Sequence, residues 1–394
     1  MPFTRQLPVH SPLSLRALWS GVCAAAGQDR GVSGRLRARL SAEFGASRVI
    51  LTDSGTSALA VAMRIAVSAR PTSRRILLPA YACPDLLTAI EAAEAEPVLY
   101  DIDPATLGPD LDDLRRQLQD GAAAVVVAHL YGVPVDIPAV RAVMQPTGAL
   151  LIEDAAQGVG GLLDGRPLGA HGDLAILSFG RGKGRTGGEG GACLVRDATL
   201  DVVATAVAHR LSAAASGHGA VLRSTVQWLL ARPSAYGIVA VLAGGRLGRT
   251  QYHAPSHGSL MSTTAAAIVE ANWLASDVES RYRRMRAAVF VARVTADKVW
   301  HVPMSRAGNR AEAGYLRVPV FGTVSVPPAM PALGVLPAYP RTLGAYPESV
   351  ASQGAARSCP GAEALTKRLV TVPVHSRVTA RASARLLARF LEPA

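Results

Sequence analysis

A lysine surrounded by glycine is the residue of this sequence that most strongly suggests chemistry. Of the 41 basic residues, only Lys183, Lys298 and Lys367 are lysines. Lys183 lies in SFGRGKGRTGGEGG, residues 178–191, in which seven of the fourteen residues are glycine. A lysine amine can act as a covalent catalyst by forming an imine with a carbonyl group. Flanking glycines let the backbone come close to a bound group, so we interpret this loop as part of a binding site.

Two further groups match the needs of pyridoxal phosphate, the cofactor that most often uses such a lysine. Its pyridine nitrogen needs a carboxylate, because a protonated ring is the better electron sink, and Asp154 ends the apolar run LLIED. Its phosphate needs backbone N–H groups at a helix N-terminus, which Gly55, Thr56 and Ser57 of DSGTSALAVAM can supply. Each feature has a simpler explanation when it is taken alone. The start of the helix could be only an N-cap, Asp154 could pair with an arginine, and Lys183 could be an ordinary loop lysine. Their occurrence together, in this order along the chain, favours the cofactor.

The elements that must position these residues alternate between strand and helix. Strands are predicted within residues 47–55, 74–84, 96–103, 122–132, 149–157, 172–180 and 190–197, with helices between most of them. Such alternation predicts an α/β fold with a mostly parallel sheet covered by helices on both faces. In such sheets ligands bind beyond the carboxyl ends of the strands. The polar clusters at 53–57, 81–84, 153–157 and 178–183 all fall at those ends.

The alternation of strands and helices ends near residue 255. A long helical stretch, residues 262–293, is followed by proline-rich strands within 315–322 and 367–375 and a last helix within 379–391. We therefore predict a large cofactor-binding domain at residues 1–254 and a smaller C-terminal α+β domain at 255–394. The run RYRRMR, residues 281–286, is predicted to be a solvated helix face rather than a phosphate track.

Composition excludes several classes of protein. The formal charge is +12, but the arginines are scattered and aromatic residues make up only 5%, which argues against a nucleic-acid partner. The four cysteines have no metal-ligand spacing, so we expect no metal site, and free thiols agree with a cytoplasmic location. The N-terminus lacks an apolar core of signal-peptide length.

The most apolar later stretch, YGIVAVLAGG at residues 236–245, is too short to span a bilayer. We predict a core helix there. A contact with a membrane surface is the weaker alternative, because the neighbouring Arg246 and Arg249 could face anionic lipid.

Taken together, the motifs resemble those of the DegT/DnrJ/EryC1/StrS aminotransferases, which are fold-type-I pyridoxal-phosphate enzymes best known for aminating nucleotide-linked keto-sugars. The similarity covers most of the chain and is most specific in LLIEDAAQGVGGLLDGRPLGAHGDLAILSFGRGKGRTGGEGG, residues 150–191. Further matching stretches are LTDSGTSAL, LLPAYACPDLLTAI, PVLYDIDPATL, VVVAHLYGVPVDI and RLVTVPVHSRVT.

The resemblance implies roles for single residues. Lys183 matches the imine-forming lysine and Asp154 the partner of the pyridine nitrogen. Gln157 matches the amide beside the phenolic oxygen of the cofactor. Gly55, Thr56 and Ser178 match its phosphate contacts.

The resemblance also implies an activity and a homodimer with a shared site. The activity is transfer of an amino group from a donor, glutamate in the family, to a keto-sugar or similar acceptor. Related dehydratases carry histidine where Lys183 stands, so the lysine favours amino transfer. A lyase or dehydratase on a related substrate, and a non-catalytic cofactor-binding scaffold or regulator, remain the alternatives.

Two positions depart from the family pattern. Family members usually have Phe or Trp stacked on the cofactor ring, and this sequence has Cys83 at that position, with Tyr81 nearby. Stacking on the cofactor ring is therefore expected to be weaker or to come from another residue. The family segment whose Asn reaches the phosphate of the neighbouring subunit reads SHGSLMS, residues 256–262, without Asn. We expect this segment to make that contact through backbone N–H groups, His257 or Ser259.

Overall fold

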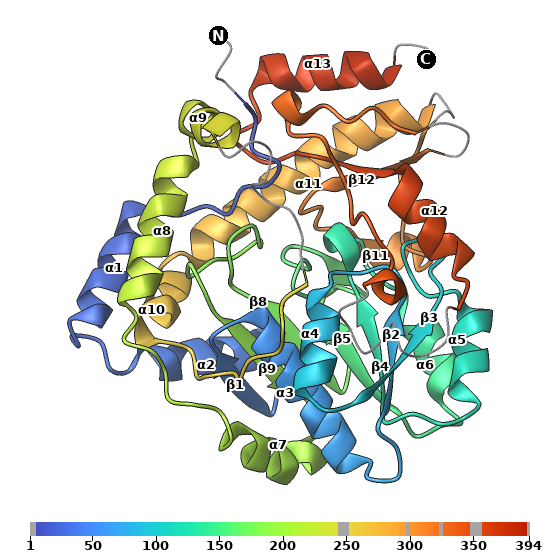
Figure 1. The fold of residues 1–394 in the computed structure, drawn as a ribbon. Coiled ribbons are helices and arrows are strands. Elements are labelled where there is room, and N and C mark those ends of the chain that lie inside the picture. Colours follow the sequence, from blue (N-terminus) through green and yellow to red (C-terminus); the bar gives the residue numbers. More distant parts are fainter. Residues whose placement is uncertain (1–4, 243–251, 297–299, 323–325, 347–356, 392–394) are drawn as a thin grey trace.

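A seven-stranded sheet forms the centre of the protein (Figure 1). The structure is a computed structural model that describes residues 5–242, 252–296, 300–322, 326–346 and 357–391. The strand order is β1-β9-β8-β5-β4-β2-β3. Neighbouring strands pair in parallel except that β9 runs antiparallel to both β1 and β8. The strands are β1 (Arg48–Thr52), β2 (Arg75–Pro79), β3 (Glu96–Tyr100), β4 (Ala124–Ala128), β5 (Leu150–Asp154), β8 (Leu174–Ser178) and β9 (Gly191–Val195).

Helices cover both faces of this sheet, as the apolar character of its strands predicts. Alternate residues of one strand enter different cores: Val125 and Val127 face one helical layer, while Ala124 and Val126 face the other. One layer contains α3 (Gly55–Ala69), α4 (Asp85–Ala92) and α7 (Asp201–Ala208). The other contains α2 (Val32–Phe44), α5 (Leu111–Leu118), α6 (Ile137–Met144) and α10 (Thr263–Ala271). The predicted α/β class and mostly parallel sheet are confirmed.

A smaller antiparallel sheet lies toward the C-terminus. Its order is β10-β12-β14-β13, with β10 (Trp300–His301), β12 (Val318–Gly322), β13 (Leu336–Pro337) and β14 (Leu369–Val372). The helices α11 (Trp273–Ala296) and α13 (Ala380–Leu391) share a core with it. The remaining elements are α12 (Pro360–Arg368) and a three-stranded sheet of β6 (Leu162–Leu163), β7 (Arg166–Pro167) and β11 (Ala311–Glu312). The division at residues 254 and 255 stays a prediction, and α10, which follows it, contributes to the core of the large sheet.

Two sequence predictions about surface and core are wrong in part. The segment beginning at Tyr236 is helical, as part of α9 (Pro233–Leu242). It is not a core helix, however, since the side chain of Ile238 is 51% exposed and that of Leu242 is 81% exposed. Among the positions of this helix whose burial is described, the buried ones are the small residues Gly237 and Ala240. Within the run at residues 281–286, Arg283 is fully buried on α11, where its guanidinium donates to the carbonyl of Val159 at 3.1 Å.

Helix α9 belongs to a group at one edge of the molecule with α1 (Leu15–Ala25) and α8 (His218–Leu230) (Figure 1). Helix α1 packs against α10 and α8, and α8 packs against α9. None of the helices within the described ranges is both long and apolar enough to cross a membrane. Residues 243–251, which include Arg246 and Arg249, lie outside the described residues.

A buried carboxylate holds together the loops that follow the central strands. Glu153, on β5, is fully buried and accepts hydrogen bonds from His129 Nε2 at 2.9 Å, Gly169 N at 2.8 Å, His171 N at 2.6 Å and Gly172 N. Burial alone would raise the pKa of Glu153, but the hydrogen bonds and positive partners prevail and lower it to about 2. His129 Nδ1 accepts from the N–H of Val135, so its ring proton sits on Nε2.

We predict that Glu153→Gln lowers the free energy of unfolding by about 3 kcal/mol at neutral pH, because an amide cannot accept from all four donors. A carboxyl group whose pKa is lower in the folded state stabilises the protein above its unfolded pKa of about 4.5. That stabilisation is lost as the pH falls toward 2. Urea unfolding of both proteins at several pH values would therefore show the difference shrinking in acid. An equal loss in the exposed control Glu312→Gln would contradict this role.

Candidate active site

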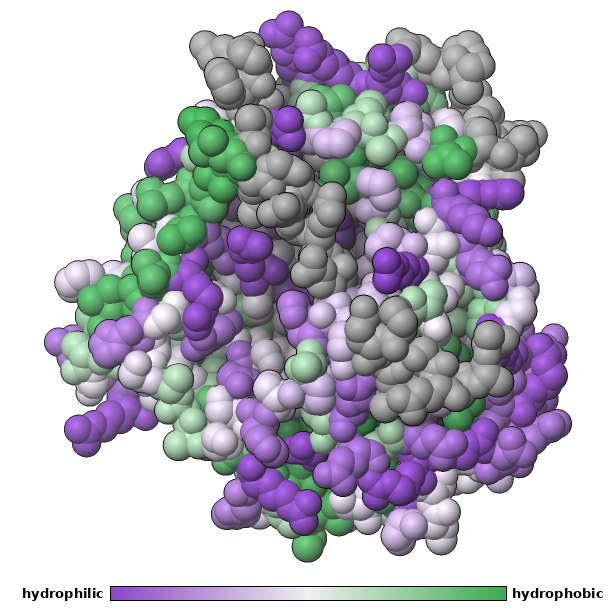
Figure 2. Space-filling model, in the orientation of Figure 1, coloured by the Kyte–Doolittle hydropathy of each residue, from purple (hydrophilic) through white to green (hydrophobic). Residues whose placement is uncertain are grey.

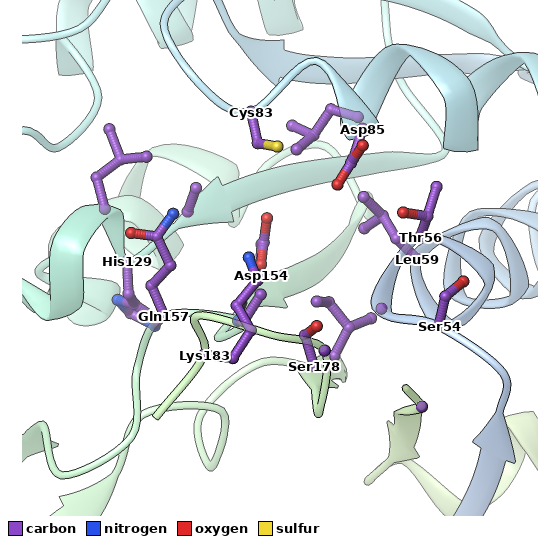
Figure 3. Close-up of a pocket in the computed structure, with 18 of the residues that line it drawn as sticks. Ser54, Thr56, Leu59, Cys83, Asp85, His129, Asp154, Gln157, Ser178 and Lys183 are labelled. Carbon is purple, nitrogen blue, oxygen red and sulfur yellow. Dashed lines mark hydrogen bonds between the residues drawn. The ribbon is translucent and has the colours of Figure 1, made fainter. Parts of the chain in front are cut away.

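A cavity of about 270 Å³ opens at the carboxyl ends of the central strands (Figure 3). It is lined by residues that follow β1, β2, β4, β5 and β8. Seven of the predicted site residues lie in its wall: Gly55, Thr56, Cys83, Asp154, Gln157, Ser178 and Lys183. The fold thus brings together groups that are up to 128 residues apart in the sequence.

One wall of the cavity is the N-terminus of α3. Ser54 caps the helix by accepting from the N–H of Ser57 at 3.1 Å, and its hydroxyl also donates to Ser57 Oγ at 2.9 Å. Residues Gly55 and Thr56 line the cavity, whereas Ser57 does not. A Cβ at position 55 would lie 2.7 Å from Cβ of Ser178 at the end of β8. Only glycine therefore lets strand and helix approach closely enough to form an anion cradle.

Lys183 enters the cavity from the glycine-rich loop after β8 (Figure 3). Its backbone is held by Ser11, whose hydroxyl donates to the carbonyl of Lys183. Among the described residues, the Lys183 amine has no hydrogen-bond or carboxylate partner. Its charge nevertheless acts on both Cys83 and Asp154. The amine is therefore free to react with a bound group.

Asp154, the last residue of β5, is partly exposed to the same cavity. One carboxylate oxygen accepts from the N–H of Ala156 at 3.0 Å, and the described residues offer no donor to the other. Burial raises the pKa of Asp154, and the charge of Lys183 and the Ala156 N–H offset only part of that effect. A cation bound against this carboxylate would lower its pKa again. The group thus suits a positively charged ring nitrogen.

Gln157 is fixed from both sides. Its Oε1 accepts from the N–H of Tyr131 at 2.9 Å, and its Nε2 donates to the hydroxyl of Tyr339 at 2.8 Å. The ring of Tyr339 lies stacked on that of Tyr131 with centroids 5.9 Å apart. These contacts set the orientation of the amide before any ligand arrives.

The position expected to carry a stacking aromatic ring holds the thiol of Cys83. Burial raises the pKa of Cys83, so the thiol stays protonated and contributes an apolar surface rather than a nucleophile. Tyr81 does not replace the missing ring, because it is fully buried, with its hydroxyl 3.4 Å from that of Tyr131. The aromatic residue that reaches the cavity is Tyr339.

The segment at residues 256–262 lies beside the α3 N-terminus of its own chain. Ser259 donates from its N–H and from its hydroxyl to Asp53 Oδ2, at 3.1 and 2.9 Å. A Cβ at Gly258 would meet Ser57 Cβ at 3.0 Å. The expected contact with the phosphate site of a neighbouring subunit stays a prediction.

A second cavity of about 280 Å³ adjoins the first. The two share the residues Cys83, Gln157, Lys183 and Tyr339. The second cavity also contains two arginines, Arg181 and Arg317, and it is bounded by the N-terminal residues 7–11 and by α8 and α9. Lys183 thus lines both the cavity at the strand ends and a neighbouring cavity of similar volume that contains two arginines.

Sequence reasoning included Asp53 and Ser54 only as members of the cluster at residues 53–57, and it missed four other residues of the first cavity: Asp85, His129, Glu189 and Tyr339. His129 directly follows β4, and the rule that strand ends carry ligands could have found it. No local signal marks Tyr339, which comes from the chain after β13 and reaches the cavity only through tertiary packing. Within the described residues, no group of His, Cys, Asp and Glu is arranged to hold a metal ion.

Comparison with known proteins agrees with this geometry. Residues 31–222 match the DegT/DnrJ/EryC1/StrS aminotransferase family. L-glutamine:2-deoxy-scyllo-inosose aminotransferase of Streptoalloteichus tenebrarius is 34% identical over 189 residues, or 47% of this chain and 44% of that protein. dTDP-4-dehydro-2,3,6-trideoxy-D-glucose 4-aminotransferase of Saccharopolyspora spinosa is 32% identical over 181 residues, 46% of each chain. These matches span less than half of either relative.

Solved structures agree over the whole fold. AtS13 from Actinomadura melliaura superposes over 99% of both chains with a TM-score of 0.75 and 24% identity. The sugar aminotransferase CalS13 from Micromonospora echinospora also covers 99% of both chains, with a TM-score of 0.73 and 22% identity. Residues 31–222 of this chain are thus similar to the DegT/DnrJ/EryC1/StrS aminotransferase family, and the fold-type-I architecture expected from its motifs is confirmed.

We predict that Gly55→Ala weakens pyridoxal phosphate binding by about tenfold or more, because the added methyl group must displace Ser178 or α3. Fluorescence titration would measure the affinity, and urea unfolding would measure any loss of stability.

Gly34→Ala is the matched control, since a Cβ there meets nothing within 4 Å on the exposed face of α2. It should bind the cofactor normally and be slightly more stable, as expected for alanine in a helix. Unchanged affinity in Gly55→Ala would contradict the assignment of the cradle.

Proposed function

We propose that this protein is a pyridoxal-phosphate-dependent aminotransferase. It would move an amino group from an α-amino acid, L-glutamate or L-glutamine, to a keto-sugar, with a nucleotide-linked sugar as the favoured acceptor. The observation that carries the proposal is the meeting, in one cavity, of an unpartnered lysine amine, a carboxylate without a full set of donors and a capped helix N-terminus.

The residues fit the cofactor chemically. The N-terminus of α3, with Gly55 and Thr56, would hold the phosphate through backbone N–H groups. Asp154 would pair with the protonated ring nitrogen, which would supply the cation that its buried carboxylate lacks. Gln157 would donate to an oxygen substituent of the ring, because its amide is already oriented by Tyr131 and Tyr339.

When bound, pyridoxal phosphate supplies an aldehyde for covalent attachment of amines and a ring that accepts electrons. The protein's own part is to position groups and to move protons. Lys183 Nζ has no salt-bridge partner among the described residues, so it would be free to move a proton from one carbon to another as general base and acid. Asp154 would favour the protonated form of the pyridine nitrogen, because a negative charge nearby stabilises a cation.

The second cavity suits an anionic acceptor. Arg181 and Arg317 line it, and guanidinium groups pair well with phosphate oxygens. The names of the curated relatives support the same class: one acts on a dTDP-linked keto-sugar and one on 2-deoxy-scyllo-inosose, a cyclic ketone without a nucleotide. An acceptor screen should therefore include both kinds.

A homodimer and a cytoplasmic location are part of the proposal. The apolar fraction of 49% and the low share of charged residues, 18%, favour a sizeable contact between copies. Sedimentation velocity of the cofactor-loaded protein tests the dimer directly, and a catalytically active monomer would argue against it.

We predict that borohydride treatment of the cofactor-loaded protein attaches the cofactor irreversibly to Lys183, as read by peptide mass mapping. Lys183→Ala should lose amino transfer by about 10²–10⁴-fold, because the proton-transfer group is removed, while it still binds the cofactor noncovalently. The control Lys367→Ala should behave as wild type. An adduct on Lys298 or Lys367 would refute the assignment.

Asp154→Asn should lower kcat by about 100-fold, because a neutral amide does not stabilise the positive ring nitrogen. The fold should survive, since the two side chains have the same shape, and circular dichroism would verify this. Asp85→Asn removes the same charge from the opposite wall of the cavity and should change kcat by less than about threefold. Near-normal turnover of Asp154→Asn would leave this carboxylate a purely structural role.

A further inference from the structure

Three neighbouring helices, α1, α8 and α9, expose large apolar side chains at one edge of the protein. We call these residues the outer apolar face: Leu15, Trp19, Val22, Leu222, Val226, Leu229, Ile238 and Leu242. Trp19 is 67% exposed and Leu222 66%. Figure 2 shows hydrophobic surface gathered along α8 and α9 at this edge. Monomeric soluble proteins rarely leave contiguous apolar patches of this kind without a function.

The spacing shows that these side chains form ordered stripes. On α1 they recur at positions 15, 19 and 22, and on α8 at 222, 226 and 229, which is one face of a helix in each case. The opposite faces of these helices already pack inward through Ala17, Gly21 and Ala24 on α1 and through Ala220 and Ser224 on α8. The outer apolar face is therefore additional to what the fold itself buries.

The formally charged residues of α1, α8 and α9 and of the turn between α8 and α9 are all arginines: Arg16, Arg223 and Arg232. In the described part of the chain, Arg16 and Arg232 have no carboxylate partner, and Arg232 lies over the ring of Trp228 at 4.9 Å. Arg223 is already paired with Glu189. Apolar residues bordered by unpaired arginines match the chemistry of an anionic bilayer surface.

A second copy of this chain is a poor occupant by comparison. The outer apolar face of a second copy contains no carboxylate with which Arg16 and Arg232 could pair. An anionic bilayer matches each of these side chains. The leucines can enter the apolar acyl region, the indole of Trp19 can lie at the boundary with the headgroups, and the guanidinium groups can bind the lipid phosphates.

We propose that the outer apolar face docks this protein on the surface of an anionic lipid bilayer. The inference goes beyond the proposed amino transfer and does not rest on it. Helices α1, α8 and α9 would lie flat in the headgroup region, with Arg16 and Arg232 at the level of the lipid phosphates. Because Gln227, Leu230 and Tyr236 line the second cavity from the inner side of α8 and α9, docking would hold one wall of that cavity at the membrane.

Cosedimentation of the full-length, cofactor-loaded protein with vesicles tests the proposal. We expect binding to phosphatidylcholine vesicles that contain about 30 mol% phosphatidylglycerol. Binding should fall by about tenfold or more when salt rises from about 0.05 M to about 0.5 M, or when phosphatidylglycerol is omitted. No binding by the wild-type protein to the anionic vesicles would overturn the proposal.

Variants separate the outer apolar face from the general positive charge of the chain. Trp19→Ser combined with Leu222→Ser should weaken vesicle binding by about tenfold or more. The control Val202→Ser with Met285→Ser removes side chains that are 81% and 58% exposed on α7 and α11, and it should bind within about twofold of wild type.

Two further results would overturn the proposal. One is equal loss of vesicle binding in the two double variants, which would mean that the outer apolar face has no special part. The other is a loss of self-association confined to the Trp19 and Leu222 variant in sedimentation velocity, which would make this face a contact between copies.

Discussion

Two adjacent carboxylates at the end of β5 govern the arrangement of the site. Successive residues of a strand point to opposite sides of the sheet, so Glu153 turns into the protein while Asp154 opens to the cavity. Glu153 takes hydrogen bonds from the ring of His129 and from the loop that precedes β8. It thereby ties the ends of β4 and β5 to the start of β8, the strand that leads to the lysine loop.

The two carboxylates also differ in how well their hydrogen bonds offset the cost of burial. The hydrogen bonds to Glu153 exceed the cost of its burial, and the pKa falls to about 2. The bonds to Asp154 do not, and its pKa is raised. A carboxylate with few donors and a lysine amine in the wall of one cavity are features that favour a ligand site over a packed core.

Sequence reasoning succeeded where chemistry and chain order coincide and failed where tertiary packing decides. Asp154 and Lys183 follow strands, and the rule that ligands gather at the carboxyl ends of parallel strands is enough to bring them together from chain order alone. Tyr339 obeys no such rule, because it comes from the C-terminal third of the chain. The exposure of α9 could not be read either, since an apolar helix has the same sequence pattern whether it is covered or not.

The glycines around Lys183 have a reason that the sequence did not suggest. Helices α8 and α10 press directly on this loop: a Cβ at Gly187 would lie 2.7 Å from the carbonyl oxygen of Ala265, and one at Gly188 would lie 2.9 Å from that of Ala220. A side chain at either position would push a helix away and move the lysine with it. Helix α8 also carries the outer apolar face on its far side, so the contact that places Lys183 and the surface that meets the bilayer belong to one rigid element. A displacement of α8 at the membrane would reach the lysine loop through its contact with Gly188.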